Sequence, residues 1–368
     1  MILKRFYLKN FRNYEECSIV PAEELNLVVG PNGWGKSNLL EGIFLISVGR
    51  DPWGAELKEL VRFGESDALV RGEWEKRNMV ELRINKSGSK EIILNEKRLH
   101  RLSTLVGLFP SSIAGPQEVE LVVGSPKVRR RLLDLHLSQI SREYLESLTR
   151  YQKYLKGRNQ LLKGIREGTK PIGGELYIET WDEKLVEEGA KILTLRRKFL
   201  EALTPVASQI YRELSGEPLT LTLQYEATVK DGDTHEIAKT FLRLLKKNRE
   251  REVELGETIV GPHRDDFQVF LGERALRVYG SWGECRSASL AIILGISHLL
   301  AEKYETSPVI ILDDCFANLD NTRMKNLLQL IRGFGQVFAS TPTYTTSLLE
   351  ASGKIFRLAG PGRIEEEK

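Results

Sequence analysis

The spacing of apolar residues in the first third of the chain predicts several strands and one early helix. Residues 2–8 are a candidate strand, Leu25–Val29 is a short run typical of a buried strand, and the stretch 66–94 alternates apolar and polar residues. Pro110–Gly115 is a further candidate strand. Asn38–Val48 has apolar residues at helical spacing, so we expect a helix soon after the Leu25–Val29 strand.

The middle of the chain, from Lys127 to about Leu214, predicts two long helices. Apolar residues recur three or four positions apart, with charged residues between them. The glycine-rich stretch Gly168–Gly174 predicts a connecting loop, and a second amphipathic run extends over Trp181–Ile210. Two amphipathic stretches joined by a loop indicate an antiparallel helical arm.

This arm carries local positive charge. The basic residues that we consider as contacts to DNA phosphates are Lys127, Arg129, Arg130, Arg131, Lys153, Lys156 and Arg158. Such a row is equally typical of a solvated helix face, and a track for DNA phosphates is the alternative. The pattern alone leaves both interpretations open.

The segment after the Leu25–Val29 strand matches the phosphate-loop pattern GxxxxGK[ST] at every fixed position. It consists of Gly30, Pro31, Asn32, Gly33, Trp34, Gly35, Lys36 and Ser37, followed by Asn38. The glycines at 33 and 35 let the backbone curl so that its N–H groups point at a phosphate, and the helix N-terminus adds positive potential. We expect Lys36 to reach the β- and γ-phosphates of ATP, and Ser37 to ligate Mg²⁺.

Near the C-terminus, the apolar run Val309–Leu312 predicts a buried parallel strand that ends at two aspartates. Ligands bind at the carboxyl edge of the strands in an open α/β sheet. Asp313 is therefore a candidate Mg²⁺ ligand. Asp314 is a candidate general base that polarises a water towards the γ-phosphate. An apolar helix over Ser287–Leu300 and a strand over Val337–Ser340 flank this acidic strand.

Three further motifs are ambiguous on their own. Arg12 and Asn13, just before Tyr14, belong either to an ordinary hairpin or to the base and ribose side of a nucleotide site. Gln117 is either a surface residue or, in a P-loop ATPase, a contact to Mg²⁺ or the attacking water. Ser281–Glu284 is either a plain helix N-cap or a phosphate contact.

Composition limits the kinds of DNA surface, cellular compartment and membrane contact that we expect. The chain has 368 residues and a net charge of +3, so any DNA surface must be a local patch. Its three cysteines fit neither a disulfide framework nor a zinc site, which favours a reducing compartment. The N-terminus becomes charged too early for a signal peptide, and the uncharged apolar stretch Ser287–Ala301 is shorter than the ~20 residues of a membrane span. We expect a cytoplasmic protein without membrane contact.

The order of these motifs resembles the ABC ATPases of chromosome and repair proteins, the SMC-like class. A helical arm separates the phosphate loop from the acidic strand, and a Ser-x-Gly-Glu helix start precedes that strand. The resemblance narrows to the RecF family of bacterial recombination-mediator ATPases. It is carried by LKNFRNY at 8–14, GPNGWGKSN at 30–38, the arm segment 129–163, GPHRDDF at 261–267 and ILDDCFANLD at 311–320.

The resemblance implies an α/β fold. An ABC-type P-loop ATPase head, a mixed sheet with flanking helices, would be assembled from residues 1–124 and 257–368, and the antiparallel helical arm would be inserted as residues 125–256. In that class two subunits share each ATP site. The residues that the resemblance assigns are Arg12 and Asn13 as nucleotide contacts, Gln117 as the Q-loop residue, and Ser281, Gly283, Glu284 and Asp320 as groups acting in trans.

The resemblance also implies a function: a weak DNA-dependent ATPase of recombinational repair. ATP and Mg²⁺ would close a homodimer into a clamp on double-stranded DNA at single-strand gaps. RecR and RecO would be partners in loading RecA, with roles in replication restart and the SOS response. An SMC-like structural tether is one alternative, which the short arm disfavours. A small-molecule kinase is another, which leaves Ser281–Glu284 unexplained. The family usually has Gln where this chain has Trp282.

Overall fold

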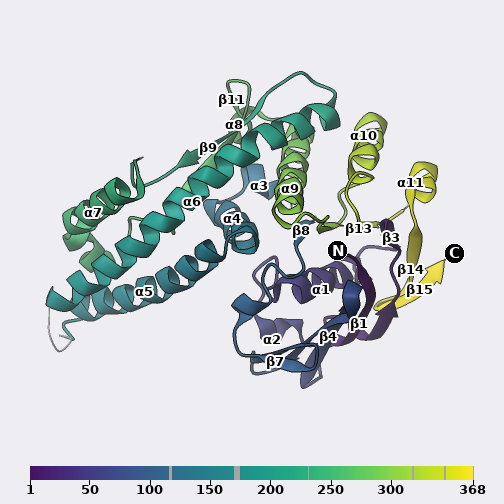
Figure 1. Ribbon diagram of the computed structural model, residues 1–368, viewed down its shortest axis with the longest axis horizontal. Coiled ribbons are helices and arrows are strands. Elements are labelled where there is room, and N and C mark those ends of the chain that lie inside the picture. Colours follow the sequence, from purple (N-terminus) through teal and green to yellow (C-terminus); the bar gives the residue numbers. More distant parts are fainter. Residues whose placement is uncertain (116–117, 170–174, 231, 317–318, 344, 368) are drawn as a thin grey trace. The chain divides into compact units, whose positions relative to one another are not determined.

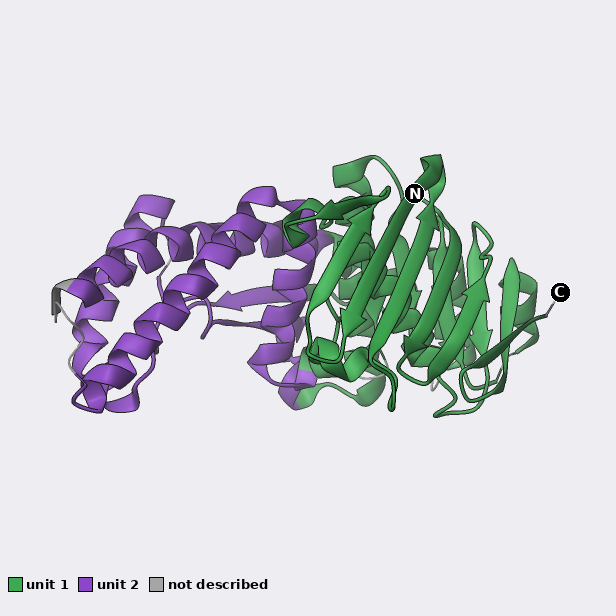
Figure 2. Ribbon diagram, turned by 90° about the horizontal axis from the view of Figure 1, so that it is seen from below, with its two compact units in different colours: residues 1–122, 206–221, 279–368 green, residues 123–205, 222–278 purple. Residues whose placement is uncertain are grey.

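The structure, a computed structural model, describes residues 1–368 apart from 116–117, 170–174, 231, 317–318, 344 and 368. The chain forms two compact units (Figure 2). Unit 1 comprises residues 1–122, 206–221 and 279–368, and unit 2 comprises residues 123–205 and 222–278.

These units divide the chain differently from the expected domains at two places. Residues 257–278, expected in the ATPase head, lie in unit 2 because their strands belong to a small sheet with the strand at 221–226. Residues 206–221, expected in the arm, lie in unit 1. There the Leu214 carbonyl accepts a hydrogen bond of 3.2 Å from Asn326, which belongs to the same unit.

A mixed sheet of unit 1 combines strands from both ends of the chain. Its strands are β3 (Leu25–Val29), β8 (Ser111–Ala114), β12 (Val309–Leu312), β13 (Val337–Thr341), β14 (Lys354–Gly360) and β15 (Arg363–Glu367), in the order β15-β14-β3-β13-β12-β8. All neighbours are parallel except β14 and β15. Thr341 pairs with Val29 and Leu312 pairs with Ala339, so β3, β12 and β13 end at the same edge. This confirms the prediction that N- and C-terminal segments build one sheet.

A second sheet of unit 1 is antiparallel. It consists of β1 (Leu3–Phe11), β2 (Tyr14–Ile19), β4 (Asp67–Trp74), β5 (Asn78–Asn85), β6 (Lys90–Leu94) and β7 (Lys97–Leu99), in the order β2-β1-β4-β5-β6-β7. Helix α1 (Lys36–Val48) packs on strands of both sheets. It is buried almost all round, which explains why its apolar residues are not confined to one face.

Other helices contribute to unit 1 and its borders. They are α2 (Leu57–Leu60), α3 (Glu120–Val123), α9 (Trp282–Tyr304), α10 (Asn321–Ile331) and α11 (Thr346–Ala351). Helix α9 is the one described helix that is long and apolar enough to cross a membrane, but 78% of its most apolar window is buried inside the protein. The protein itself therefore covers most of its apolar surface, as for a core helix.

Unit 2 is mainly helical. Its elements are α4 (Pro126–Ile140), α5 (Arg142–Arg166), the first part of α6 (Glu175–Ser215), β9 (Leu221–Glu226), α7 (Thr234–Leu255), β10 (Asp266–Leu271), β11 (Arg274–Ala275) and α8 (Leu276–Tyr279). Helices α5 and α6 lie side by side (Figure 1). Arg150 contacts Glu188 and Arg158 contacts Asp182, so the contacting residue numbers increase along α5 while they decrease along α6. The two helices are therefore antiparallel, as predicted.

Candidate nucleotide site

The phosphate loop has the backbone that its glycines predict. Gly33 and Gly35 have φ angles of 80° and 110°, in the region that only glycine enters at little cost. Gly35 is the N-cap residue of α1, which begins at Lys36. A Cβ atom on Gly35 would lie 2.5 Å from the Asn13 side chain, so a larger residue is excluded by space as well as by φ.

Two residues at the turn between β1 and β2 hydrogen-bond to backbone carbonyls of the phosphate loop. Asn13 Nδ2 donates to the Trp34 carbonyl at 2.9 Å, and the buried Tyr14 hydroxyl donates to the Gly35 carbonyl at 2.9 Å. Asn38 Nδ2 donates to Asn13 Oδ1 at 2.8 Å. The hydrogen bonds of Asn13 thus fix the backbone of the phosphate loop, and Asn13 acts as a positioning residue.

The loop and the acidic strand meet at one pocket. The phosphate pocket has a volume of about 310 Å³ and is lined by Asn32, Gly33, Gly35, Lys36, Ser37, Asn38, Asp313 and Asp314. Lys36 Nζ donates to the Gly30 carbonyl at 2.7 Å. Asp313 and Asp314 lie close enough to raise the pKa of Lys36, although burial has the larger effect and lowers it. The two motifs, about 280 residues apart in the chain, therefore form one polar site.

Asp313 is held by two hydroxyl groups. Ser340 Oγ on β13 donates to Asp313 Oδ1 at 2.5 Å, and the Ser37 hydroxyl also hydrogen-bonds this carboxylate. Burial raises the pKa of Asp313, and both hydrogen bonds oppose that rise. A carboxylate beside the phosphate-loop serine supplies the oxygen ligands that Mg²⁺ prefers.

Asp314 has a different environment. Its φ is 56°, a left-handed conformation that aspartate tolerates better than most residues, and its backbone N–H donates to Ser340 Oγ at 2.8 Å. Its Oδ1 atom is buried and has no hydrogen-bond partner among the residues that the structure describes. Burial raises the pKa of Asp314, while the charges of Lys36 and Arg286 lower it. An unpaired carboxylate oxygen at a phosphate pocket fits a group that accepts a proton from water.

A buried ion pair lies behind Asp314. Arg286, in the first turns of α9, contacts Glu118 with Nε at 2.8 Å from Oε1 and donates from Nη2 to the Asp314 carbonyl at 2.9 Å. Burial raises the pKa of Glu118, and the Arg286 charge opposes it. The helix that begins at the signature residues thus contacts the acidic loop directly. The predicted Q-loop residue, Gln117, lies outside the described residues.

The predicted signature residues form a helix cap. Ser281 Oγ accepts from the Glu284 N–H at 3.2 Å, and Glu284 Oε2 accepts from the Ser281 N–H at 2.7 Å, which is a capping box for α9. Asp320 is the N-cap residue of α10, with Oδ1 accepting from Arg323 N–H at 2.9 Å. Neither these residues nor Gly283 are among the described residues that line this chain's phosphate pocket.

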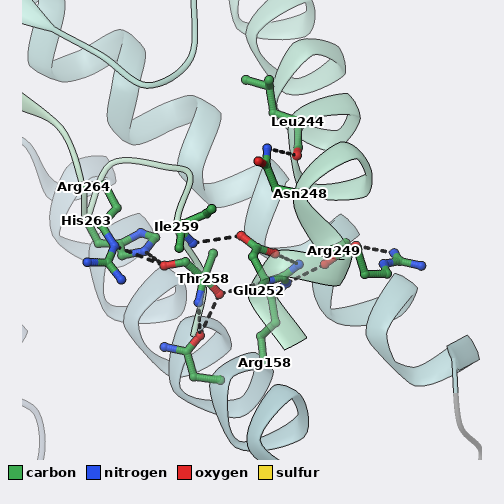
Figure 3. Close-up of polar contacts among 11 residues, drawn as sticks. Arg158, Leu244, Asn248, Arg249, Glu252, Thr258, Ile259, His263 and Arg264 are labelled. Atoms are coloured by element: carbon green, nitrogen blue, oxygen red, sulfur yellow. Dashed lines mark hydrogen bonds and ion pairs between the residues drawn. The ribbon is translucent and has the colours of Figure 1, made fainter. Parts of the chain in front are cut away.

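Two of the predicted DNA contacts are wrong. Arg158 is fully buried and points at Glu252 and Thr258 (Figure 3). Its guanidinium contacts Asp182 at 2.6 Å, Glu252 at 2.7 Å and the Thr258 hydroxyl at 2.8 Å. Arg129 is also buried, with Nε 2.6 Å from Asp266 Oδ1. Both guanidiniums are committed to internal carboxylates and cannot meet DNA.

The other predicted arm contacts differ in exposure. Lys127, Lys153 and Lys156 are exposed. Arg130 is half-buried and donates to the Asp265 carbonyl at 2.7 Å, and Arg131 is half-buried. Lys127, Lys153 and Lys156 therefore remain the accessible candidates of the original set.

The polar turn at 261–267 has a structural role. His263 Nε2 lies 2.9 Å from the Thr258 carbonyl, and its Nδ1 lies 2.7 Å from the Tyr151 hydroxyl. Burial lowers the pKa of His263 to about 4, so the ring is neutral at pH 7. No cluster of three His, Cys, Asp or Glu side chains suited to a metal occurs within the part of the chain that the structure describes.

Sequence reasoning did not single out Ser340, Arg286 or Glu118. Ser340 ends the strand predicted beside the acidic strand, which was the available signal. Arg286 lies two positions after Glu284, and Glu118 lies next to Gln117. Their roles depend on contacts across the fold that no local pattern reveals.

Comparisons with known proteins agree with this geometry. Residues 2–358 match the family model described as "RecF/RecN/SMC N terminal domain". The "DNA replication and repair protein RecF" of Ligilactobacillus salivarius (strain UCC118) is 34% identical, with 100% of this chain and 98% of the relative covered. The protein of that name from Bacillus cereus (strain B4264) is 34% identical, with 93% and 92% covered.

Solved structures support the same family and fold. The structure described as "Structure of the recombination mediator protein RecF-ATP in RecFOR pathway" matches with a TM-score of 0.89 and 32% identity, covering 100% of this chain and 97% of that chain. A crystal structure of an Smc head bound to a domain of ScpA matches with a TM-score of 0.57 at 16% identity, which shows the fold alone. The resemblance predicted from the motifs is confirmed, and the chain belongs to the RecF family of SMC-like ABC ATPases.

Proposed function

We propose that this protein is an ATP-dependent DNA-binding protein of recombinational repair. The observation that carries the proposal is the phosphate pocket, where Lys36, Ser37, Asp313 and Asp314 converge. The relatives named above are DNA replication and repair proteins, and the matched solved structure is a recombination mediator with ATP.

The chemistry is ATP hydrolysis. The loop N–H groups and Lys36 bind the phosphates, while Ser37, Asp313 and Gln117 would hold Mg²⁺, which neutralises phosphate charge when bound. Asp314 accepts a proton from the water that attacks the γ-phosphorus, and the bond to the ADP oxygen breaks. Ser340 positions both acids, because its hydroxyl contacts the Asp313 carboxylate and the Asp314 N–H.

The pocket is completed by a second copy of the chain. Ser281, Gly283, Glu284 and Asp320 sit at the N-terminal caps of α9 and α10, where N–H groups suit an anion. They are absent from the described lining of their own chain's phosphate pocket. ATP held between two subunits would therefore join them, and hydrolysis would release them.

The biological role follows the family. The dimer would clamp double-stranded DNA beside single-strand gaps in the cytoplasm and assist RecO and RecR in loading RecA, with consequences for replication restart and the SOS response. The ATPase would be slow and stimulated by DNA. The words "RecFOR pathway" attached to the matched structure support this assignment.

The first test is the solution mass by light scattering, without nucleotide and with ATP–Mg²⁺. We expect a 41.8 kDa monomer to double in mass only with ATP. Asp314→Asn is expected to remain doubled for longer, because it binds ATP and hardly hydrolyses it.

Ser281→Arg is the matched test of the shared site, since a bulky cation replaces a small cap while the phosphate loop is untouched. It should bind ATP and stay monomeric. A wild-type mass that does not respond to ATP would contradict the shared-site proposal.

DNA binding is expected to depend on the exposed arm lysines. Replacing Lys153 and Lys156 by Glu should weaken binding to a duplex and lower the slope of log affinity against log salt by about 2, since each phosphate contact contributes about 1. Fluorescence anisotropy over a salt series measures this. Lys97→Glu with Lys303→Glu makes the same charge change at exposed positions of unit 1. Equal effects of the two pairs would contradict a phosphate track on α5.

A further inference from the structure

A second hollow adjoins the phosphate pocket. It has a volume of about 600 Å³, and its lining includes Arg12, Asn38, Glu59 and Phe63. Asn38 also lines the phosphate pocket, so the two hollows meet at the first turn of α1. A ligand with phosphates in the first hollow has room to extend into the second.

Phe63 is the unusual feature of this hollow. Its relative exposure is 102%, so the ring is as free as in an extended peptide, although it belongs to an ordered unit. Large aromatic side chains normally bury most of their surface in a fold. Because Phe63 also lines the hollow next to the phosphate pocket, a ligand that extends out of the phosphate pocket meets an exposed aromatic ring there.

The backbone around Phe63 is fixed. Arg62 N–H donates to the Asn10 carbonyl at 2.8 Å, and Glu65 N–H donates to the Arg62 carbonyl at 3.0 Å. Gly64, with a φ of 93°, occupies the position of this tight turn that requires positive φ. The turn thus holds Phe63 at its corner, tied to the segment that precedes Arg12.

Arg12 also lines this hollow, but its guanidinium is held in place by hydrogen bonds and is less free to stack on a ligand. Its Nη2 and Nε atoms contact Glu41 at 2.7 and 2.9 Å, and its Nη1 donates to the Glu59 carbonyl at 3.2 Å. These contacts fix the guanidinium as a charged wall of the hollow. The exposed apolar face is supplied by Phe63.

We propose that Phe63 is the platform on which the base of the bound nucleotide stacks, with the nucleotide's phosphates in the adjoining phosphate pocket. The inference rests on the proposed ATP site and assigns its base-binding residue. A base face stacks on an aromatic ring whatever its edge presents. Phe63 therefore increases the affinity for a nucleotide over that for inorganic phosphates, but it does not discriminate between different bases.

The test compares ADP–Mg²⁺ with pyrophosphate–Mg²⁺ by isothermal titration calorimetry. Neither ligand carries the γ-phosphate on which the shared site depends, so binding is measured without dimer closure. Phe63→Ala is expected to weaken ADP binding about 5- to 150-fold, the range for loss of one stacked base. Pyrophosphate binding should stay at the wild-type value. Phe63→Trp should bind ADP at least as tightly as wild type.

Leu349→Ala is the matched control, because it removes another exposed apolar side chain of unit 1, on α11, and should change neither ligand. Equal ADP affinity in wild type and Phe63→Ala would overturn the proposal. Equal weakening of ADP and pyrophosphate would also overturn it, because Phe63 would then act on the phosphate loop. Wild-type protein that binds neither ligand would refute the nucleotide site itself.

Discussion

Asp314→Asn is expected to lower the ATP hydrolysis rate by about 10² to 10⁴-fold, the usual contribution of a positioned general base. ATP binding should be no weaker than in wild type, because the substitution removes a negative charge from a pocket that receives phosphates. Asparagine also tolerates the φ of 56° at this position, so the backbone should not change. Phosphate release and equilibrium ATP binding, measured on the same preparation, separate the two effects.

The pH dependence of the wild-type rate tests the same residue. Because burial raises the pKa of Asp314, the rate should fall as pH drops through a value above the ~3.9 of an ordinary aspartate.

The raised pKa also predicts the effect of the substitution on stability. A carboxyl whose pKa is higher in the folded state opposes folding once it is ionised, so Asp314→Asn should be at least as stable as wild type at pH 7. Asp67→Asn is the control, since it removes an exposed carboxylate of the same unit and should leave hydrolysis unchanged. A rate within a fewfold of wild type in Asp314→Asn would exclude Asp314 as the base.

The phosphate pocket was predictable because each of its parts has a local signature. The buried strand, the glycine loop and the helix are adjacent in sequence, and their chemistry dictates the residue types. Asp313 and Asp314 follow a run of four apolar residues, and parallel strands place their carboxyl ends at one edge. Sequence reasoning therefore identified two motifs about 280 residues apart as one site.

The hydrogen bonds that tune the site were not predictable. Ser340 and Glu118 have no distinctive neighbours, and their effect comes from the strand order β3-β13-β12-β8 and from contacts to Asp313 and Arg286. The unit border at Pro205 also has no local signal, because α6 continues through it without a break in its helical pattern.

The burial of Arg158 could have been predicted from the spacing of the apolar residues in α5. The apolar stripe of α5 runs through Tyr144, Leu148, Tyr151, Leu155 and Leu162, and position 158 falls on it. Lys153 and Lys156 do not. A charged residue on the apolar stripe of a helix is more consistent with an internal ion pair than with a surface track, although its partners on α6 and α7 follow only from the fold.

Arg158→Met is expected to lower the stability of unit 2 by about 3–5 kcal/mol, the usual cost of removing one partner from a buried charge network. Arg158 on α5 contacts Asp182 on α6. It also contacts Glu252 on α7 and Thr258, which follows α7 (Figure 3). Met fills similar volume but leaves two carboxylates without their central cation. Hydrogen–deuterium exchange should accelerate by about 10² to 10⁴-fold in α5 and α7, with α1 as the internal reference.

The pH dependence of this variant identifies the cause. Burial raises the pKa of Glu252, and Arg158 opposes that rise, so removing Arg158 should raise the pKa further. A carboxyl whose pKa is raised in the folded state makes stability increase as pH falls through that raised pKa toward the ~4.3 of an ordinary glutamate, so Arg158→Met should recover part of its loss in that window. Lys156→Met, an exposed change on the same helix, should cost less than about 0.5 kcal/mol. A pH-independent loss in Arg158→Met would indicate a packing defect and contradict the charge network as the source of stability.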